Sequence, residues 1–271
     1  DNNIFLGIGA GRQVSTGEDN IFIGKNSGGQ NASTPTTGID NISLGRSSGN
    51  CLSSGANNVF IGKYAGTKTT GGDDNVFLGK YAGCSNTGDD NIYMGCQAGR
   101  CATGGDDNIF LGRKAAGTGA VTGCYNIAFG FQAGNSLTVG CDNIFIGKEA
   151  GSESTTCCGS VLIGSEAGKN NDASYNVFLG MKAGRGSSTA SNNTGGCNVF
   201  LGFCAGYSFT SGADNIAIGE NAGKGITSGC DNIILGQSAG EGNTTGCYNI
   251  FFGKLTAGQT TVTGGCNIAM G

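Results

Sequence analysis

The chain has 271 residues, among them 55 glycines, 13 cysteines and one proline, and it contains neither histidine nor tryptophan. Its formal net charge of −4 argues against nucleic acid as the main partner, because phosphate binding needs concentrated Lys and Arg. No apolar run approaches the roughly 18 residues that span a bilayer, so we expect no membrane insertion. Without His there is no Ser-His or Cys-His pair and no His-ligated metal, and we expect no enzyme.

One five-residue motif recurs along the whole chain. It reads Asn, then Ile or Val, a variable residue, a large apolar residue and Gly, with Ser160 as the one departure at its first position. In chain order the copies lie at 3–7, 20–24, 41–45, 58–62, 75–79, 91–95, 108–112, 126–130, 143–147, 160–164, 176–180, 198–202, 215–219, 232–236, 249–253 and 267–271. A helix-turn-helix repeat needs more than about 30 residues, and apolar residues two positions apart share one face of a strand.

We therefore predict an all-β fold, a parallel β-solenoid (a β-roll or β-helix) of about 15–16 coils with roughly 17 residues per coil. The expected organisation is a single continuous array over 1–271. Asp1 and Gly271 both lie next to or within a motif, and no polar capping repeat is visible within residues 1–271. Solenoids normally carry such caps, so we expect an excerpt of a longer array or a subunit of a stacking filament.

The columns of the motif differ in kind. We expect the Ile/Val and the large apolar columns to point inward and form the core, the invariant Gly to mark a corner, and the Asn side chains to stack. By alternation the middle column would then point outward as an assembly stripe, because a long apolar stripe is rarely left in water. Its aromatic members are Phe5, Phe22, Phe60, Phe77, Tyr93, Phe110, Phe145, Phe178, Phe200 and Phe251. The alternative is that the coil is wide enough to bury this column as a second layer.

A column of Thr and Ser residues suggests a second function. It comprises Thr16, Thr37, Ser54, Thr70, Thr87, Thr103, Thr122, Thr210, Thr227, Thr244 and Thr263. A flat Thr ladder on a solenoid could order water and bind ice. The alternative is turn chemistry, because Ser and Thr side chains hydrogen-bond to the backbone in turns. Adjacent pairs such as Thr69-Thr70 face different sides, which favours the turn interpretation.

Three acidic pairs and a basic column flank the motifs. Asp73-Asp74, Asp89-Asp90 and Asp106-Asp107 would repel one another unless a cation lay between them, so calcium is the one cofactor considered; the alternative is a turn role for Asp beside Asn. Basic residues follow the invariant Gly and are expected to form a solvated face. They are Lys25, Arg46, Lys63, Lys80, Arg113, Lys148 and Lys254.

Several cysteines recur at 17-residue spacing, which places them on neighbouring coils with Cα atoms inside the disulfide range. The candidates are Cys84, Cys101, Cys124, Cys141, Cys158, Cys230 and Cys247. Disulfides between coils would imply an oxidising compartment; the alternative is that the thiols are small apolar fillers. Candidate glycosylation sequons begin at Asn31, Asn192 and Asn243, and we expect all three in variable loops.

The stretches 126–134 and 215–223, Asn-Ile-Ala-Phe-Gly-Phe-Gln-Ala-Gly and Asn-Ile-Ala-Ile-Gly-Glu-Asn-Ala-Gly, resemble the head repeats of trimeric autotransporter adhesins. Similar arrays occur in phage tail-fibre proteins. The resemblance covers the Asn, Ile/Val, Leu/Ile, Gly and Ala columns of all the repeats. It implies a left-handed β-roll, often trimeric, that acts as a surface fibre or adhesin. This chain has a longer period and carries Phe and Cys where those repeats rarely do.

Together these patterns predict an extracellular structural fibre or filament protein that assembles with itself and is adhesive. The expected partners are copies of the chain, as a trimer or a head-to-tail or lateral filament, and surface glycans; the expected location is the cell surface or a virion fibre. Two alternatives stay open, an ice-binding solenoid that uses the Thr ladder and a β-helix that acts on or binds polysaccharide.

Overall fold

The computed structural model describes residues 2–29, 35–188, 193–258 and 261–271. Within these ranges the chain forms sixteen three-residue parallel strands and no helix, which confirms the predicted all-β solenoid. Accordingly, none of the described residues belongs to a helix that is long and apolar enough to cross a membrane. The chain divides into two compact units, which are treated separately below.

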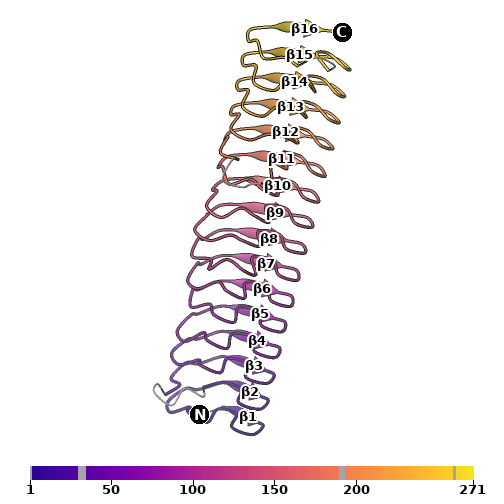
Figure 1. The fold of residues 1–271 in the computed structure, drawn as a ribbon. Coiled ribbons are helices and arrows are strands. Elements are labelled where there is room, and N and C mark those ends of the chain that lie inside the picture. Colours follow the sequence, from indigo (N-terminus) through magenta and orange to yellow (C-terminus); the bar gives the residue numbers. More distant parts are fainter. Residues whose placement is uncertain (1, 30–34, 189–192, 259–260) are drawn as a thin grey trace. The chain divides into compact units, whose positions relative to one another are not determined.

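Unit 1 comprises Asp1–Gln132 and Ser136–Gly140. Its strands are β1 (Ile4–Leu6), β2 (Ile21–Ile23), β3 (Ile42–Leu44), β4 (Val59–Ile61), β5 (Val76–Leu78), β6 (Ile92–Met94), β7 (Ile109–Leu111) and β8 (Ile127–Phe129). Each strand pairs in parallel with the next one along the chain, as Figure 1 shows. Equivalent residues lie opposite each other, for example Phe77 opposite Tyr93, so every motif position forms a column.

Unit 2 comprises Ala133–Asn135 and Cys141–Gly271. Its strands are β9 (Ile144–Ile146), β10 (Val161–Ile163), β11 (Val177–Leu179), β12 (Val199–Leu201), β13 (Ile216–Ile218), β14 (Ile233–Leu235), β15 (Ile250–Phe252) and β16 (Ile268–Met270). The pairing is again parallel and in register from β9 to β16 (Figure 1). The two units therefore use one coil design.

The middle column and the Asn column face the interior. In the coil of β5, Asn75 and Phe77 are fully buried, whereas Val76 and Leu78 are half-buried. Our assignment of the strand faces was therefore reversed: the Ile/Val and large apolar columns point outward and the aromatic column forms the core. The physical reason is the Asn. Its side chain finds hydrogen-bond partners only inside the coil, and the residue two positions later shares its face.

The core is one aromatic ring thick. A Cβ added to Gly83 would lie 2.4 Å from the Phe77 ring, so the Gly of the Ala-Gly pair is the wall against which the ring packs. Rings on neighbouring coils stack, with centroids 4.9 Å apart for Phe77 and Tyr93 and 4.7 Å for Tyr93 and Phe110. Burying each ring contributes about 1.5–3 kcal/mol, which is why so narrow a coil can hold together.

The invariant Gly is required by the next coil. Gly79 has a φ of +137°, and a Cβ there would lie 2.5 Å from the carbonyl oxygen of Gly95. Within each unit, the equivalent glycines that precede another coil meet the same backbone oxygen of that coil. A side chain would therefore both strain the backbone and push neighbouring coils apart.

Buried Asn side chains form a hydrogen-bonded ladder along each unit. Asn75 donates its Nδ2 to the Oδ1 of Asn58 at 3.1 Å and to the carbonyl of Gly88 at 2.9 Å. Its own Oδ1 accepts the backbone N–H of Asn91 at 3.0 Å. Each Asn thus bonds to the coil before it and the coil after it. At Ser160 the hydroxyl takes over part of this role and accepts the N–H of Asn176.

Candidate functional site: the outward face of the sheet

The aromatic column is not an assembly stripe, which corrects the interpretation favoured from the sequence. Nine of its ten predicted members are buried inside the coil, and only Phe5 in the coil of β1 is exposed, at 40%. The members concerned are Phe5, Phe22, Phe60, Phe77, Tyr93, Phe110, Phe145, Phe178, Phe200 and Phe251. The alternative of a buried layer is the correct one, and it is the principal layer of the core.

One signal in the sequence could have revealed this. Where the middle residue is small, the residue nine positions later is a large aliphatic: Leu52 follows Ser43, Leu137 follows Ala128 and Ile226 follows Ala217. All six are fully buried. Large and small residues exchange in this way when they fill the same space, so the middle column had to face the inside.

The outward face is formed by alternate residues of each coil. Around β6, Asp90, Ile92, Met94 and Cys96 are exposed, and the residues between them are buried or half-buried. Four columns result. The first and third strand residues form an apolar strip, the residue before the motif Asn forms one border of the strip, and the residue after the invariant Gly forms the other. Neighbouring strands cover the sides of these residues, so the exposure that remains is that of the outward face.

In unit 1 the two borders carry opposite charge. The acidic column consists of Asp19, Asp40, Asp74, Asp90 and Asp107, and the basic column of Lys25, Arg46, Lys63, Lys80 and Arg113. All ten side chains are exposed. Asn57 and Cys96 occupy the two remaining positions between β2 and β7. Within the ranges that the structure describes, no ion pair involves any of the ten.

Like charges stack along the acidic column. Loss of hydration and the neighbouring carboxylates of Asp107 and Asp74 raise the pKa of Asp90. The basic column is held differently: the Nζ of Lys63 lies 5.2 Å from the centre of the Tyr64 ring and that of Lys80 5.5 Å from the Tyr81 ring. Such contacts stabilise a cation weakly at an exposed site and leave its charge available.

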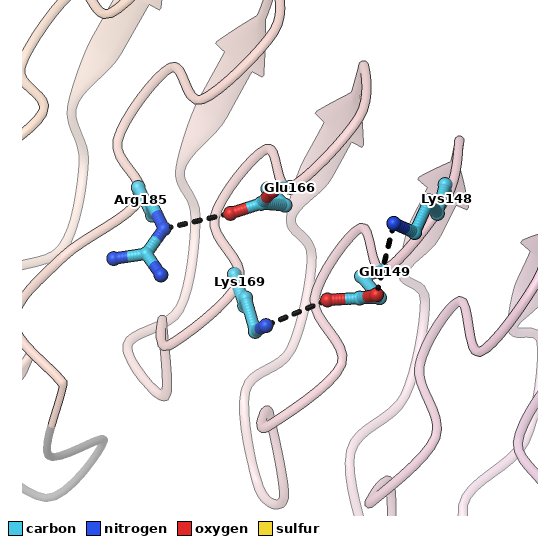
Figure 2. Close-up of polar contacts among 5 residues, drawn as sticks. All are labelled: Lys148, Glu149, Glu166, Lys169 and Arg185. Atoms are coloured by element: carbon cyan, nitrogen blue, oxygen red, sulfur yellow. Dashed lines mark hydrogen bonds and ion pairs between the residues drawn. The ribbon is translucent and has the colours of Figure 1, made fainter.

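Unit 2 has the same apolar strip, but its borders keep the charge order of unit 1 only in the coil of β9, with Asp142 and Lys148. After the invariant Gly stand Met181, Phe203 and Glu220, and before the Asn stand Tyr175 and Tyr248. Leu179 and Ile218 in the strip are 49% and 40% exposed. Beside the strip lie short ion pairs, Lys169 Nζ to Glu149 Oε2 at 2.6 Å and Arg185 Nε to Glu166 Oε2 at 2.9 Å (Figure 2).

These ion pairs lower the pKa values of their carboxyl groups, whereas the pKa of Asp90 is raised. The hydrogen bond from Lys169 lowers the pKa of Glu149, and the hydrogen bond from Arg185 lowers the pKa of Glu166. Lys148 adds to the first pair, with its Nζ 3.5 Å from Glu149 Oε1 (Figure 2). In unit 2 the charges beside the strip are thus partly satisfied within the chain.

The acidic pairs do not converge on a cation site. The first Asp of each pair bonds to the backbone of the preceding coil. Asp89 Oδ1 accepts the backbone N–H of Asp73 at 2.8 Å, and Asp106 Oδ1 accepts the backbone N–H of Asp89 at 2.9 Å. Their partners Asp74, Asp90 and Asp107 lie on the outward face instead. Among the residues that the structure describes, no three His, Cys, Asp or Glu side chains are arranged to hold a metal ion.

Cysteines that occupy the column of Asp73, Asp89 and Asp106 in later coils also accept a backbone N–H from the preceding coil. Cys158 Sγ accepts the N–H of Cys141, and Cys247 Sγ accepts the N–H of Cys230 at 3.1 Å. The thiols of Cys230 and Cys247 lie 2.8 Å apart, and that contact is the main reason that the pKa of Cys230 rises to about 12. Cys101 lies close enough to Cys84 to contribute to the raised pKa of that thiol, which burial dominates. Cys124 occupies the same column and its Sγ accepts the N–H of Asp106.

Three members of the Thr column donate their hydroxyls to backbone carbonyls. Thr210 and Thr227 donate their hydroxyls to the carbonyls of Thr227 and Thr244, at 2.9 and 3.1 Å. Thr87 donates in the same way to the carbonyl of Thr103. These hydroxyls close turns between coils, as the turn interpretation expects. A face that orders water would instead leave them free.

The sequon at Asn243 does not lie in an exposed loop. Its side chain is fully buried, with Nδ2 3.4 Å from the carbonyl oxygen of Gly246. The expectation of a glycosylation site there was therefore wrong. Asn243 stands nine positions after the middle strand residue Ile234 and belongs to the core. Asn31 and Asn192 lie outside the described residues. No pocket is present in the part of the chain that the structure describes.

Comparisons with known proteins found no matching family model, no matching curated protein and no matching solved structure.

Proposed function

We propose that this chain is an extracellular structural protein that assembles with copies of itself into a fibre and that adheres to surfaces through its repeated face. The observation that carries the proposal is the apolar strip, two columns of Ile, Val, Leu, Met and Phe side chains left half-buried or exposed on the outward face of both units. A continuous apolar patch of this size on a protein surface usually marks an interaction site.

Repetition supports the same function. Every coil presents the strip again, with its side chains in register with those of its neighbours. A partner that binds one coil weakly can bind many coils at once, and such multivalent contact gains affinity without any new kind of contact. The design therefore suits assembly and adhesion more than turnover of a substrate.

Inter-coil disulfides are part of this proposal for the pair Cys230 and Cys247, whose sulfur atoms are in contact. Oxidation would join the two sulfurs, release two protons and pass two electrons to an oxidant such as glutathione disulfide. The bond would close a 17-residue loop and stabilise the coil by about 3 kcal/mol. Peptide mass spectrometry after incubation with glutathione disulfide should find the Cys230–Cys247 cross-link, and its absence would remove this element of the proposal.

The proposal is tested by sedimentation velocity and negative-stain electron microscopy of the chain kept under reducing conditions. We expect concentration-dependent assemblies, and we expect Leu179→Gln combined with Ile218→Gln to weaken them because both side chains lie in the strip. Ser211→Gln combined with Ser228→Gln, at exposed positions of unit 2 away from the strip, serves as the control. A wild-type chain that stays monomeric at every concentration would contradict the proposal.

A further inference from the structure

The outward face of unit 1 is negative along one border and positive along the other, and this charge order determines the orientation in which a second copy could pack on it. Across each strand the order is acidic residue, two apolar residues, basic residue, as in Asp74, Val76, Leu78 and Lys80. The same order recurs at Asp19 to Lys25, Asp40 to Arg46 and Asp107 to Arg113. From β2 to β7, apart from Asn57 and Cys96, one border of the strip is therefore negative and the other positive.

Building on the proposed self-assembly, we propose that two copies pair through this face of unit 1, sheet on sheet, with their stacking axes parallel. The two copies are then related by a twofold axis that runs along the stack. This rotation reverses the strand direction, so the acidic column of each copy faces the basic column of the other. If the stacks ran antiparallel instead, the rotation would keep the strand direction, and acidic would face acidic.

Charge decides between the two arrangements because the apolar strip fits both. Like charges placed opposite each other across an interface cost several kcal/mol, whereas complementary columns steer and orient the partners. Loss of hydration is the main cause of the raised pKa of Asp90, and the carboxylates of Asp107 and Asp74 on the neighbouring coils add to it by repulsion. A facing basic column relieves that repulsion. None of the ten border side chains has an ion-pair partner within the described residues.

The area is adequate for a specific pair. From β1 to β8 the unit offers seven inter-strand steps of about 4.8 Å, and from acidic to basic column six residues of about 3.3 Å each. Because only three of these residues are in a strand, the face measures at most about 34 by 20 Å, or at most about 700 Å² on each copy, a little below the roughly 800 Å² per partner of a standard interface. Packed sheets lie about 10 Å apart, a gap that Lys and Arg side chains span in part to reach an opposing Asp.

Charge reversal tests the pairing without altering the interior. One variant carries Asp74→Lys, Asp90→Lys and Asp107→Lys, and the other carries Lys63→Glu, Lys80→Glu and Arg113→Glu. We expect each variant alone to self-associate at least about 100-fold more weakly, because both borders then bear one sign. An equimolar mixture of the two should associate again. The matched control, with Arg12→Glu, Lys68→Glu and Arg100→Glu, changes the net charge equally at exposed positions outside the face and should associate like the wild type.

A third variant, which carries both sets of reversals, distinguishes the orientations. With parallel stacks it should self-associate like the wild type but fail to pair with the wild type, since its borders are exchanged. Native mass spectrometry of a mixture with a mass-tagged wild type measures this, and circular dichroism melting confirms that each variant folds. Preferential pairing of the wild type with this variant would establish the antiparallel arrangement and overturn the inference.

The outcomes separate this inference from the proposed function. If the wild type assembles and the single-border variants assemble equally well, the parallel pairing through unit 1 is wrong and self-assembly stands. If the wild type remains monomeric throughout, self-assembly itself fails and the pairing fails with it.

Discussion

In unit 1 the residue after the invariant Gly is basic in five coils, whereas in unit 2 it is basic only at Lys148 and Lys254, and Met181, Phe203 and Glu220 stand at equivalent positions. The interiors show no such divergence. Both units bury the Asn ladder, the middle column and the Ala of the Ala-Gly pair. Positions that face the next coil's backbone or the core are constrained by contact, whereas outward positions are free to change. The chemical differences between the units therefore lie on the outward borders.

The largest expected effect tests whether the interiors are equivalent. Gly95→Ala and Gly219→Ala should each lower the free energy of unfolding by about 3 kcal/mol or more, because a Cβ would lie 2.5 and 2.6 Å from the carbonyl oxygen of the next invariant Gly. Gly104→Ala is the control, since the nearest atom to its Cβ is 4.0 Å away. Urea unfolding measures all three. A cost at one unit alone would show that the coils are not equivalent.

The exchange of volume within a coil gives the next largest effect. Ala128→Phe should overfill the core and Leu137→Ala should leave a cavity, each at a cost of about 2–4 kcal/mol. The double variant should recover at least about 1 kcal/mol of the summed loss, because the two side chains share one space. Ala217→Phe with Ile226→Ala is the corresponding cycle in unit 2. Additive losses in thermal or urea unfolding would contradict shared packing.

A buried hydroxyl group that is present in unit 1 and absent from the equivalent position of unit 2 should have a smaller effect on stability. Tyr93 is fully buried in unit 1, and its hydroxyl has no hydrogen-bond partner among the described residues. Tyr93→Phe should therefore raise the free energy of unfolding by about 1 kcal/mol. Phe178→Tyr places a hydroxyl in the equivalent position of unit 2 and should lower it by about 1–3 kcal/mol. Unchanged stability in both variants would mean that the hydroxyl finds a partner in solution.

The smallest effect is a pH dependence of opposite sign in the two units. The raised pKa of Asp90 means that the folded chain holds this proton more tightly, so stability falls as pH rises through the window between its unfolded and folded values. The lowered pKa values of Glu149 and Glu166 contribute stability above their unfolded values, which is lost as pH falls through the folded ones.

Carbon-13 NMR titration of the carboxyl groups measures these pKa values directly. Asp107→Asn should lower the pKa of Asp90 because it removes a neighbouring negative charge, and Arg185→Met should raise that of Glu166 because it removes the hydrogen-bond donor. Thr103→Val, which changes no charge, is the control. If the pKa values of Asp90, Glu149 and Glu166 were all raised, or all lowered, relative to their ordinary values, the two units would not differ in this electrostatic property.

The coil and its length followed from the sequence, whereas the orientation of its columns did not. The three strand residues alternate in the same way whichever face is buried, so Val76 and Leu78 alone could not distinguish inside from outside. The Asn column distinguishes them, because a polar side chain is buried where it can be fully hydrogen-bonded. The borders were visible in part: the basic residues after Gly were expected on a solvated face, and they lie there. The opposing Asp column was instead interpreted as paired carboxylates.

The exchange between Ala128 and Leu137 also bears on how such a chain can change its length. Ala128 and Leu137 balance volume within one coil, whereas Phe209 packs against the rings of both Phe178 and Phe200 and so links the cores of two neighbouring coils. A coil of the first kind can therefore be duplicated with less repacking of its neighbours than a coil of the second kind. The unit that is duplicated or lost is then a segment of about 17 residues, which can begin at any position of the repeat. The length of the array then becomes a trait that recombination between such segments can adjust.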